Sequence, residues 1–204
     1  MPIEALFWSL LLILSPALGS RLWPALRERY DHFPIDIKVW AAWIHSLGLP
    51  YMAIILGSVS GRKMGLYGQG AGEWFIGFLA CGFGLGAAIL LLNRQDKRPD
   101  PEVDLVSNIQ EETRWAFYRA AATLWLPGML SLLLGFGLAV LELGTTHVQT
   151  SGRQAPSPSQ WKIVLRAALS TTLFLATGNF WITAGTQLAI STILNKRSRE
   201  DSLD

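Results

Sequence analysis

Two adjacent glutamates, Glu111 and Glu112, are the side chains of this sequence best suited to acid–base chemistry. A carboxyl group can act as a general base when a like charge or a dry pocket raises its pKa. Adjacent residues of a helix diverge by about 100°, so only one of the two glutamates would face inward. Arg114 and Arg119 follow them and could neutralise them. Alternatively, the segment begins a helix at a membrane surface, where its charges face water and lipid head groups.

His45 is a second candidate, because it lies inside an apolar stretch. An ionisable residue in such a place could bind a haem or a chlorophyll-type pigment, or hydrogen-bond to a quinone. The simpler interpretation is a packing or hydrogen-bonding role, and we expect no cofactor. His32 and His147 lie in connecting segments, and Cys81 is the single cysteine, so neither a zinc-type site nor a disulfide is supported.

The composition and the charge distribution predict the elements that would position these residues. Of the 204 residues, 50% are hydrophobic and 16% are charged, whereas soluble domains are about a quarter charged. The charges cluster between five apolar stretches, and a bilayer crossing takes about 20 helical residues. We therefore predict an all-α, polytopic transmembrane helical bundle. The apolar stretches are residues 3–23, 39–59, 74–93, 115–143 and 163–194.

The last two stretches are too long for one straight span, and each contains a break. Pro127 and Gly128 interrupt the fourth stretch, since proline removes a backbone donor and clashes with the preceding turn. Thr177, Gly178 and Asn179 interrupt the fifth. Each stretch is therefore either one kinked helix or two helices folded back, which gives up to seven helical pieces. The N-terminal segment MPIEA carries an acid and no base, so we expect the first stretch to be a retained helix and not a signal peptide.

Basic residues predict the orientation of this bundle. Most Lys and Arg residues follow the first and third stretches or lie in the tail 195–204. Because basic loops favour the cytoplasmic side, we predict a multi-pass protein of the cytoplasmic (inner) membrane, with its N-terminus outside and its tail cytoplasmic. Without a repeat or a soluble segment, residues 1–204 form a single membrane domain. The expected partners are the lipid bilayer and other membrane protein subunits, and the net charge of +2 does not indicate nucleic acid.

Three segments share a pattern in order and spacing: HSLGLPYMAIILGSVSGRKMGLYG at 45–68, EETRWAFYR at 111–119 and ATGNFWITAGTQLAIS at 176–191. Together they resemble the CAAX prenyl protease and bacteriocin-processing family of intramembrane metalloproteases, over residues 45–194. That family's signature is an EExxxR helix, an FxxxH helix, and a TGxLW-type turn before a helix with HxxxN or HxxxD. The resemblance implies that the first glutamate and the histidines would activate a water for peptide hydrolysis.

This signature is incomplete in the present chain. Glu111 and Glu112 match the glutamate pair, but the signature arginine falls on Ala116 and the first histidine on Val140. The second histidine falls on Gln187. Neither valine nor glutamine can accept a proton in turnover or bind a metal as imidazole does. The resemblance therefore implies a member that has lost its catalytic histidines. The remaining family positions are Phe136, Asn179, Trp181, Gln187 at the second histidine and Ser191 at the Asn or Asp.

Small and polar residues predict close contacts between helices. Gly82 and Gly86 form a small-xxx-small pair, which lets helices pack closely within this chain or with a partner helix. Thr183, Gln187 and Ser191 share one face of the last helix. This polar stripe is either interhelical hydrogen-bonding or the lining of a former cavity.

The leading functional hypothesis is a non-catalytic accessory or interaction subunit of a larger membrane complex. One alternative is an active glutamate-dependent intramembrane endopeptidase that uses Glu111 and Glu112. Another is a cofactor- or pigment-associated subunit of a redox or photosynthetic complex that uses His45.

Overall fold

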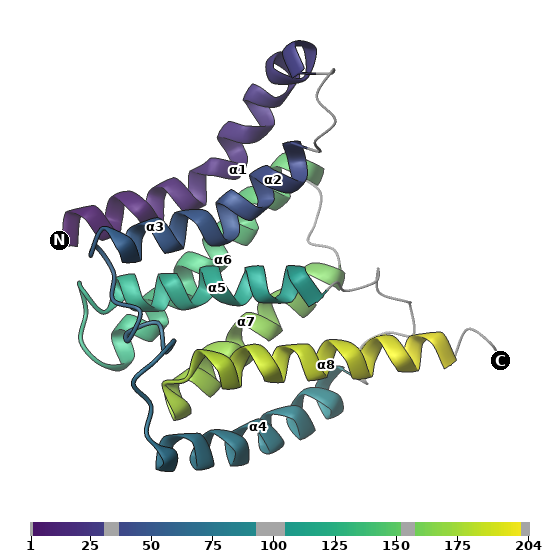
Figure 1. Ribbon diagram of the computed structural model, residues 1–204. Helices are drawn as coiled ribbons and strands as arrows, with labels where there is room; N and C mark the ends of the chain where they lie inside the picture. Colours follow the sequence, from purple (N-terminus) through teal and green to yellow (C-terminus); the bar gives the residue numbers. More distant parts are fainter. Residues whose placement is uncertain (1, 31–36, 93–104, 152–157, 201–204) are drawn as a thin grey trace. The chain divides into compact units, whose positions relative to one another are not determined.

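The computed structural model describes residues 2–30, 37–92, 105–151 and 158–200, and the regular structure in these segments is helical (Figure 1). The prediction of an all-α fold is confirmed. In chain order the helices are α1 (Pro2–Tyr30), α2 (Ile37–Trp43), a π-helical turn (Ile44–Gly48), α3 (Leu49–Ile55), α4 (Ala71–Leu92), α5 (Leu105–Ala122), α6 (Met129–Ser151), α7 (Pro158–Thr177) and α8 (Phe180–Glu200).

The chain divides into two compact units, where the sequence predicted one domain. Unit 1 comprises Met1–Ser60 and Thr113–Pro156, and unit 2 comprises Gly61–Glu112 and Ser157–Asp204. In unit 1, α1 packs against α6 and α3. In unit 2, α4 packs against α7 and α8, which also pack against each other (Figure 1). Each unit therefore combines segments that are distant in the sequence.

Both breaks in the long apolar stretches are turns between separate helices. α5 and α6 are joined by a turn that contains Pro127 and Gly128, and α7 and α8 are joined through Gly178. Gly128 has a φ of 57° and Gly178 a φ of 59°, and glycine adopts such values without the steric cost of a Cβ. Within unit 2, α8 folds back against α7. The alternative of two helices folded back at a break is therefore the one found.

The second apolar stretch contains a change of helical geometry near His45. The π-helical turn Ile44–Gly48 separates α2 from α3, and the backbone N–H of Leu49 donates to the carbonyl of Ile44, five residues earlier. Pro50 follows at the start of α3. Since its ring cannot donate and would crowd the carbonyl of a regular α-helical turn, the wider π-helical turn accommodates it.

Gly65 joins the loop before α4 to the turn between α7 and α8. Its φ is 76°, and a Cβ at this position would lie 2.5 Å from the carbonyl oxygen of Gly178. The carbonyl of Gly65 accepts a hydrogen bond from the Phe180 N–H at 3.0 Å. Nearby, the indole N–H of Trp181 donates to the carbonyl of Leu66 at 3.0 Å. This position therefore requires glycine both for its backbone angle and for the close approach.

Packing of α4 uses glycines other than the predicted pair. A Cβ on Gly77 would lie 2.9 Å from a side chain of α8, and a Cβ on Gly84 would lie 2.9 Å from a side chain of α7. Gly82 and Gly86 are exposed, and no heavy atom lies within 4 Å of a Cβ built on either. The predicted packing of Gly82 and Gly86 within the chain is therefore not found among the described residues, because α4 turns its opposite face inward.

Over the residues that the structure describes, no helix is both long and apolar enough to cross a membrane. This finding contradicts the predicted multi-pass location in the cytoplasmic membrane, with the N-terminus outside and a cytoplasmic C-terminus. In the fourth and fifth stretches the physical reason is visible. Turns divide these stretches into separate helices, and charged residues such as Glu142 on α6 and Arg166 on α7 interrupt their apolar sequences. Of the predicted tail 195–204, residues 201–204 lie outside the described segments.

Candidate functional site

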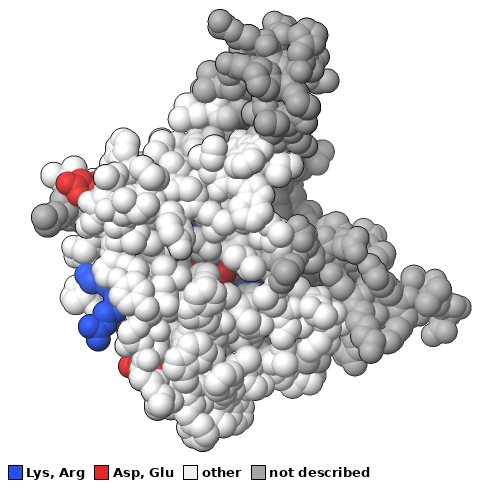
Figure 2. All heavy atoms as spheres, in the orientation of Figure 1, with Lys and Arg blue, Asp and Glu red and all other residues white. Residues whose placement is uncertain are grey.

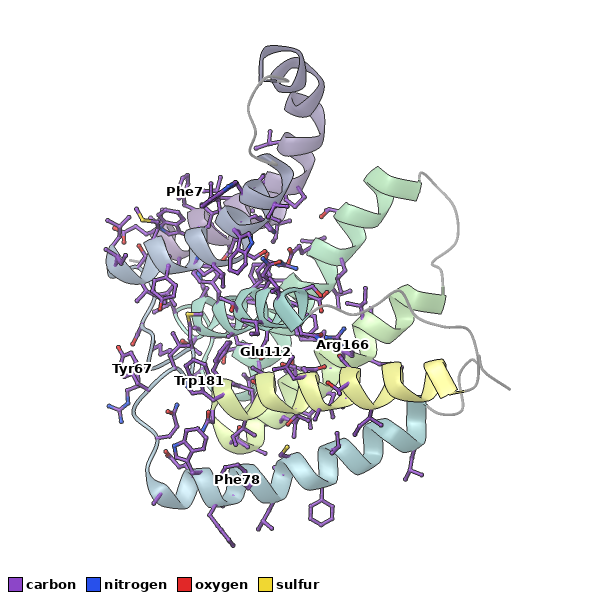
Figure 3. The ribbon with its side chains drawn as sticks, turned by 45° about the vertical axis from the view of Figure 1, so that its right-hand side comes forward. Phe7, Tyr67, Phe78, Glu112, Arg166 and Trp181 are labelled. Carbon is purple, nitrogen blue, oxygen red and sulfur yellow. The ribbon has the colours of Figure 1, made fainter. Side chains whose placement is uncertain are left out.

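Glu112 is the centre of a buried polar cluster in unit 2. Its side chain is 0% exposed. One carboxyl oxygen accepts a hydrogen bond from the hydroxyl of Ser170 on α7 at 2.6 Å, and the other accepts from the hydroxyl of Thr183 on α8 at 2.9 Å. Figure 3 shows Glu112 among these helices. The glutamate thus connects its own helix, α5, to both α7 and α8.

Arg166 on α7 forms a second group of contacts in the same unit (Figure 3). Its Nη2 lies 3.4 Å from Oε2 of Glu111 and donates a hydrogen bond to Oδ1 of Asn108. Its Nε donates to the side-chain oxygen of Gln187 at 3.1 Å, and the Gln187 amide donates back to the Arg166 carbonyl at 2.8 Å. Ser191 also donates to Asn108, at 3.3 Å. The guanidinium group therefore has a carboxylate and two amide oxygens as neighbours.

The predicted polar stripe of α8 lies within these two groups. Thr183, Gln187 and Ser191 are all buried. Each makes a hydrogen bond to a residue on another helix, Thr183 and Ser191 to α5 and Gln187 to α7. The arrangement agrees with interhelical hydrogen bonding, the first of the two interpretations of this stripe.

The family turn positions have local structural contacts. Asn179 precedes α8, and its Oδ1 accepts hydrogen bonds from the backbone N–H groups of Trp181 at 2.9 Å and Ile182 at 3.3 Å. This is the usual contact of an N-cap residue. Trp181 is exposed. The other two family positions, Phe136 and Val140, lie half-buried on α6 in unit 1.

His45 belongs to a separate polar cluster in unit 1. Its Nδ1 lies 2.6 Å from the hydroxyl oxygen of Ser15 on α1, and its Nε2 lies 3.2 Å from Oε1 of Glu142 on α6. Both ring nitrogens therefore have hydrogen-bond partners. A haem or pigment metal would have to displace one of them, so this geometry favours the hydrogen-bonding role over the predicted ligation.

Arg114 completes the cluster around Glu142. Its Nε lies 2.8 Å from Oε1 of Glu142, and its Nη1 donates to the hydroxyl of Ser46 at 2.8 Å. Burial acts to raise the pKa of Glu142, but the hydrogen bond with His45 and the positive charge of Arg114 outweigh it and hold this pKa below its ordinary value. Burial, and then the negative charge of Glu142, raise the pKa of Tyr118. Glu142 is thus an anion in a dry environment.

The charged residues of α5 find their partners on other helices. Glu111 and Glu112 contact α7 and α8, and Arg114 contacts α6. Arg119 is buried, and its backbone lies so close to Gly135 of α6 that a Cβ there would be 2.7 Å from the Arg119 Cα. The hypothesis of a charged helix start at a membrane surface is therefore wrong, because this part of α5 is buried.

Sequence reasoning did not single out Glu142 or Arg166, although both organise a cluster. A signal was available, since both are charged residues inside apolar stretches, and a buried charge requires a partner. Ser15, Asn108 and Ser170 give no comparable signal. Hydroxyl and amide side chains occur at many helical positions, and only the fold shows which of them meet a charge.

Among the described residues, no group of three or more His, Cys, Asp or Glu side chains is placed to hold a metal ion. No protein-family model matches the chain, and neither a curated protein nor a solved structure matches it. The resemblance to the CAAX protease-like family therefore stays a prediction.

Proposed function

We propose that this protein is a non-catalytic interaction subunit that binds a helical partner protein through the outer face of α4. The observation that carries the proposal is the exposed apolar surface of that helix. The surroundings of the glutamate pair and the loss of the motif histidines support it.

The surroundings of the glutamates favour a structural role. A general base has to reach a water molecule and a substrate, whereas Glu112 is fully buried and has a hydroxyl partner at each carboxyl oxygen. Glu111 lies beside the guanidinium group of Arg166. Gln187, at a histidine position of the family signature, is bound to the same arginine by two hydrogen bonds. These contacts use the glutamates as acceptors within the core of unit 2.

The outer face of α4 carries large apolar side chains that are more than half exposed. Phe83 is 80% exposed, the largest exposed fraction among them. The space-filling view shows a surface over α4 that is almost entirely uncharged (Figure 2). An exposed apolar patch of this kind marks an interaction site. The exposed apolar residues of α4 are Phe75, Ile76, Phe78, Leu79, Phe83 and Leu90.

The shape of this face suits another helix. Phe75, Leu79, Gly82, Gly86 and Leu90 follow one another at intervals of three or four residues, so they lie along one side of α4. The two glycines have open space in front of them. Because glycine has no Cβ, a ridge of side chains on a partner helix can approach the backbone of α4 closely at these two positions.

The proposal is tested by replacing these two glycines. Tagged wild-type protein and a Gly82→Leu, Gly86→Leu double variant are isolated gently from the native cells, separated by size and analysed by mass spectrometry. We expect the wild type in a defined assembly at fixed stoichiometry and the double variant outside it. Gly137→Leu is the matched control, because Gly137 is also an exposed helical glycine with nothing within 4 Å. Loss of the assembly by Gly137→Leu as well, or a wild type without any partner, would contradict the proposal.

A Glu112→Gln variant separates this proposal from the peptidase alternative. If the role of Glu112 is structural, the variant keeps the assembly, and its only change is a lower free energy of unfolding. A variant that folds and assembles normally but no longer processes a substrate protein would support the peptidase alternative instead.

A further inference from the structure

Unit 1 contains a pocket of about 430 Å³ beside the His45 cluster. This volume is within the range of about 300–1,000 Å³ usual for ligand pockets. One wall comes from α1, which contributes Ser15 and Gly19, and the other comes from the segment with the π-helical turn. Ala42, Ile44 and Leu49 give that second wall an apolar surface. π-Helical turns inside α-helices are frequently found at functional sites.

The polar end of the pocket is formed by Ser15 and His45. Glu142 is an anion and can only accept a hydrogen bond, so its 3.2 Å contact with Nε2 of His45 requires a proton on that nitrogen. In the neutral ring, Nδ1 is then an acceptor, and the Ser15 hydroxyl donates to it at 2.6 Å. In the protonated ring, Nδ1 donates to Ser15, and the hydroxyl donates to the carbonyl of Leu12 at 3.1 Å. In both arrangements the hydroxyl proton of Ser15 is used, while at least one lone pair of its oxygen is left for a ligand.

This hydrogen-bonding capacity selects the chemistry of the ligand. A group that donates one hydrogen bond can pair with the Ser15 oxygen, whereas a ligand with only an acceptor finds the hydroxyl proton already used. A charged group would have to be buried against the apolar walls, which is costly without a partner of opposite charge. Glu142 is not that partner, since it does not line the pocket.

We propose that the pocket binds an uncharged apolar alcohol, whose hydroxyl group donates a hydrogen bond to Ser15 and whose hydrocarbon part lies against Ala42, Ile44 and Leu49. The proposal depends on unit 1 alone and is independent of the interaction proposed for α4.

The test is titration of the full-length protein with 1-decanol and with its methyl ether, followed by calorimetry. The ether has the same hydrocarbon chain but no hydroxyl donor. We expect saturable binding of the alcohol and about tenfold weaker binding of the ether, the effect of one lost hydrogen bond. In Ser15→Ala this discrimination should disappear, because the accepting oxygen is gone. Equal affinity of the wild type for alcohol and ether would overturn the proposal.

Filling the pocket gives a second measurement. Ala42→Trp should abolish binding of both compounds, and Ala176→Trp, at an exposed alanine of α7, should leave binding unchanged. Gly19→Leu fills the same pocket from α1, so it serves as the test if Ala42→Trp does not fold. Undiminished binding by folded Ala42→Trp or folded Gly19→Leu would overturn the assignment to this pocket.

Discussion

Replacing Glu112 with alanine should destabilise the protein strongly, because two buried hydroxyl groups lose their acceptor. Ser170 donates to this carboxyl group at 2.6 Å and Thr183 at 2.9 Å, and the carboxyl group is fully buried. A buried donor left without a partner costs about 1–3 kcal/mol. Thr183 also lies 2.8 Å from the carbonyl of Phe180 and can donate there instead.

The empty volume left by the side chain adds to this loss, since the surrounding helices relax only partly. Together, these effects give an expected decrease of about 2–4 kcal/mol in the free energy of unfolding. Glu112→Gln keeps the size of the side chain and one acceptor oxygen, so it should lower the free energy of unfolding by no more than about 1–2 kcal/mol. The predicted order of stability is wild type, then glutamine, then alanine.

Urea unfolding followed by circular dichroism measures this order through the midpoints and slopes of the transitions. Glu73→Ala is the control, because Glu73 is an exposed glutamate that accepts the Gly70 N–H at 2.7 Å near the start of α4. Loss of such a contact at a helix start should cost about 1 kcal/mol or less. If Glu112→Ala unfolded at the wild-type midpoint, or no earlier than Glu73→Ala, the structural role assigned to Glu112 would be refuted.

Three further predictions concern backbone packing and pH. Gly65→Ala should destabilise the protein more than Gly178→Ala. Both positions need a left-handed backbone, at a cost of about 1–2 kcal/mol, but only the Cβ at position 65 meets backbone atoms. Thermal unfolding compares the two variants, and equal losses of stability would speak against the contact. Gly135→Ala should destabilise the protein, because its Cβ would lie 2.7 Å from the backbone of α5. Gly137→Ala, in open space on the same helix, should raise the free energy of unfolding by up to about 1 kcal/mol. Changes of the same sign in chemical unfolding would refute this difference. The pKa of Glu142 is lowered on folding, so the stability it contributes is present above its ordinary value of 4.5 and is lost as the pH falls through the lower, folded value. Glu142→Gln should therefore reduce the fall in stability below pH 4.5. Urea unfolding at a series of pH values measures this, and a fall as steep as in the wild type would contradict the role assigned to Glu142.

Local signals predicted the breaks in the helices well. Pro127 and the glycine at 178 disfavour a continuous helix for reasons contained in a few residues, and the structure has turns at both places. The face that α4 turns inward was not predictable in the same way. Gly77, Gly84, Gly82 and Gly86 are equally small, and only the packing against α7 and α8 distinguishes the inner pair from the outer pair.

The candidate site was predicted only in part. The helical spacing predicted that one of the two adjacent glutamates would face inward, and Glu112 is fully buried while Glu111 is 20% exposed at its side chain. Their partners could not be predicted, because Ser170 and Arg166 come from a helix more than fifty positions away. The membrane interpretation shows a related limit. It treated the apolar stretches as membrane spans and did not foresee that Glu142 and Arg166 inside them would pair with other charged residues of the chain.

The central claim is that the outer face of α4 contacts one specific partner, and crosslinking at this face tests it most directly. A photoreactive phenylalanine analogue replaces Phe83, and in a parallel variant it replaces Trp125, an exposed aromatic residue in the turn before α6. After illumination in the native cells, we predict one discrete crosslinked species from position 83, containing one partner protein, and no such species from position 125. The absence of a discrete species from position 83, or the same products from both positions, would contradict the claim.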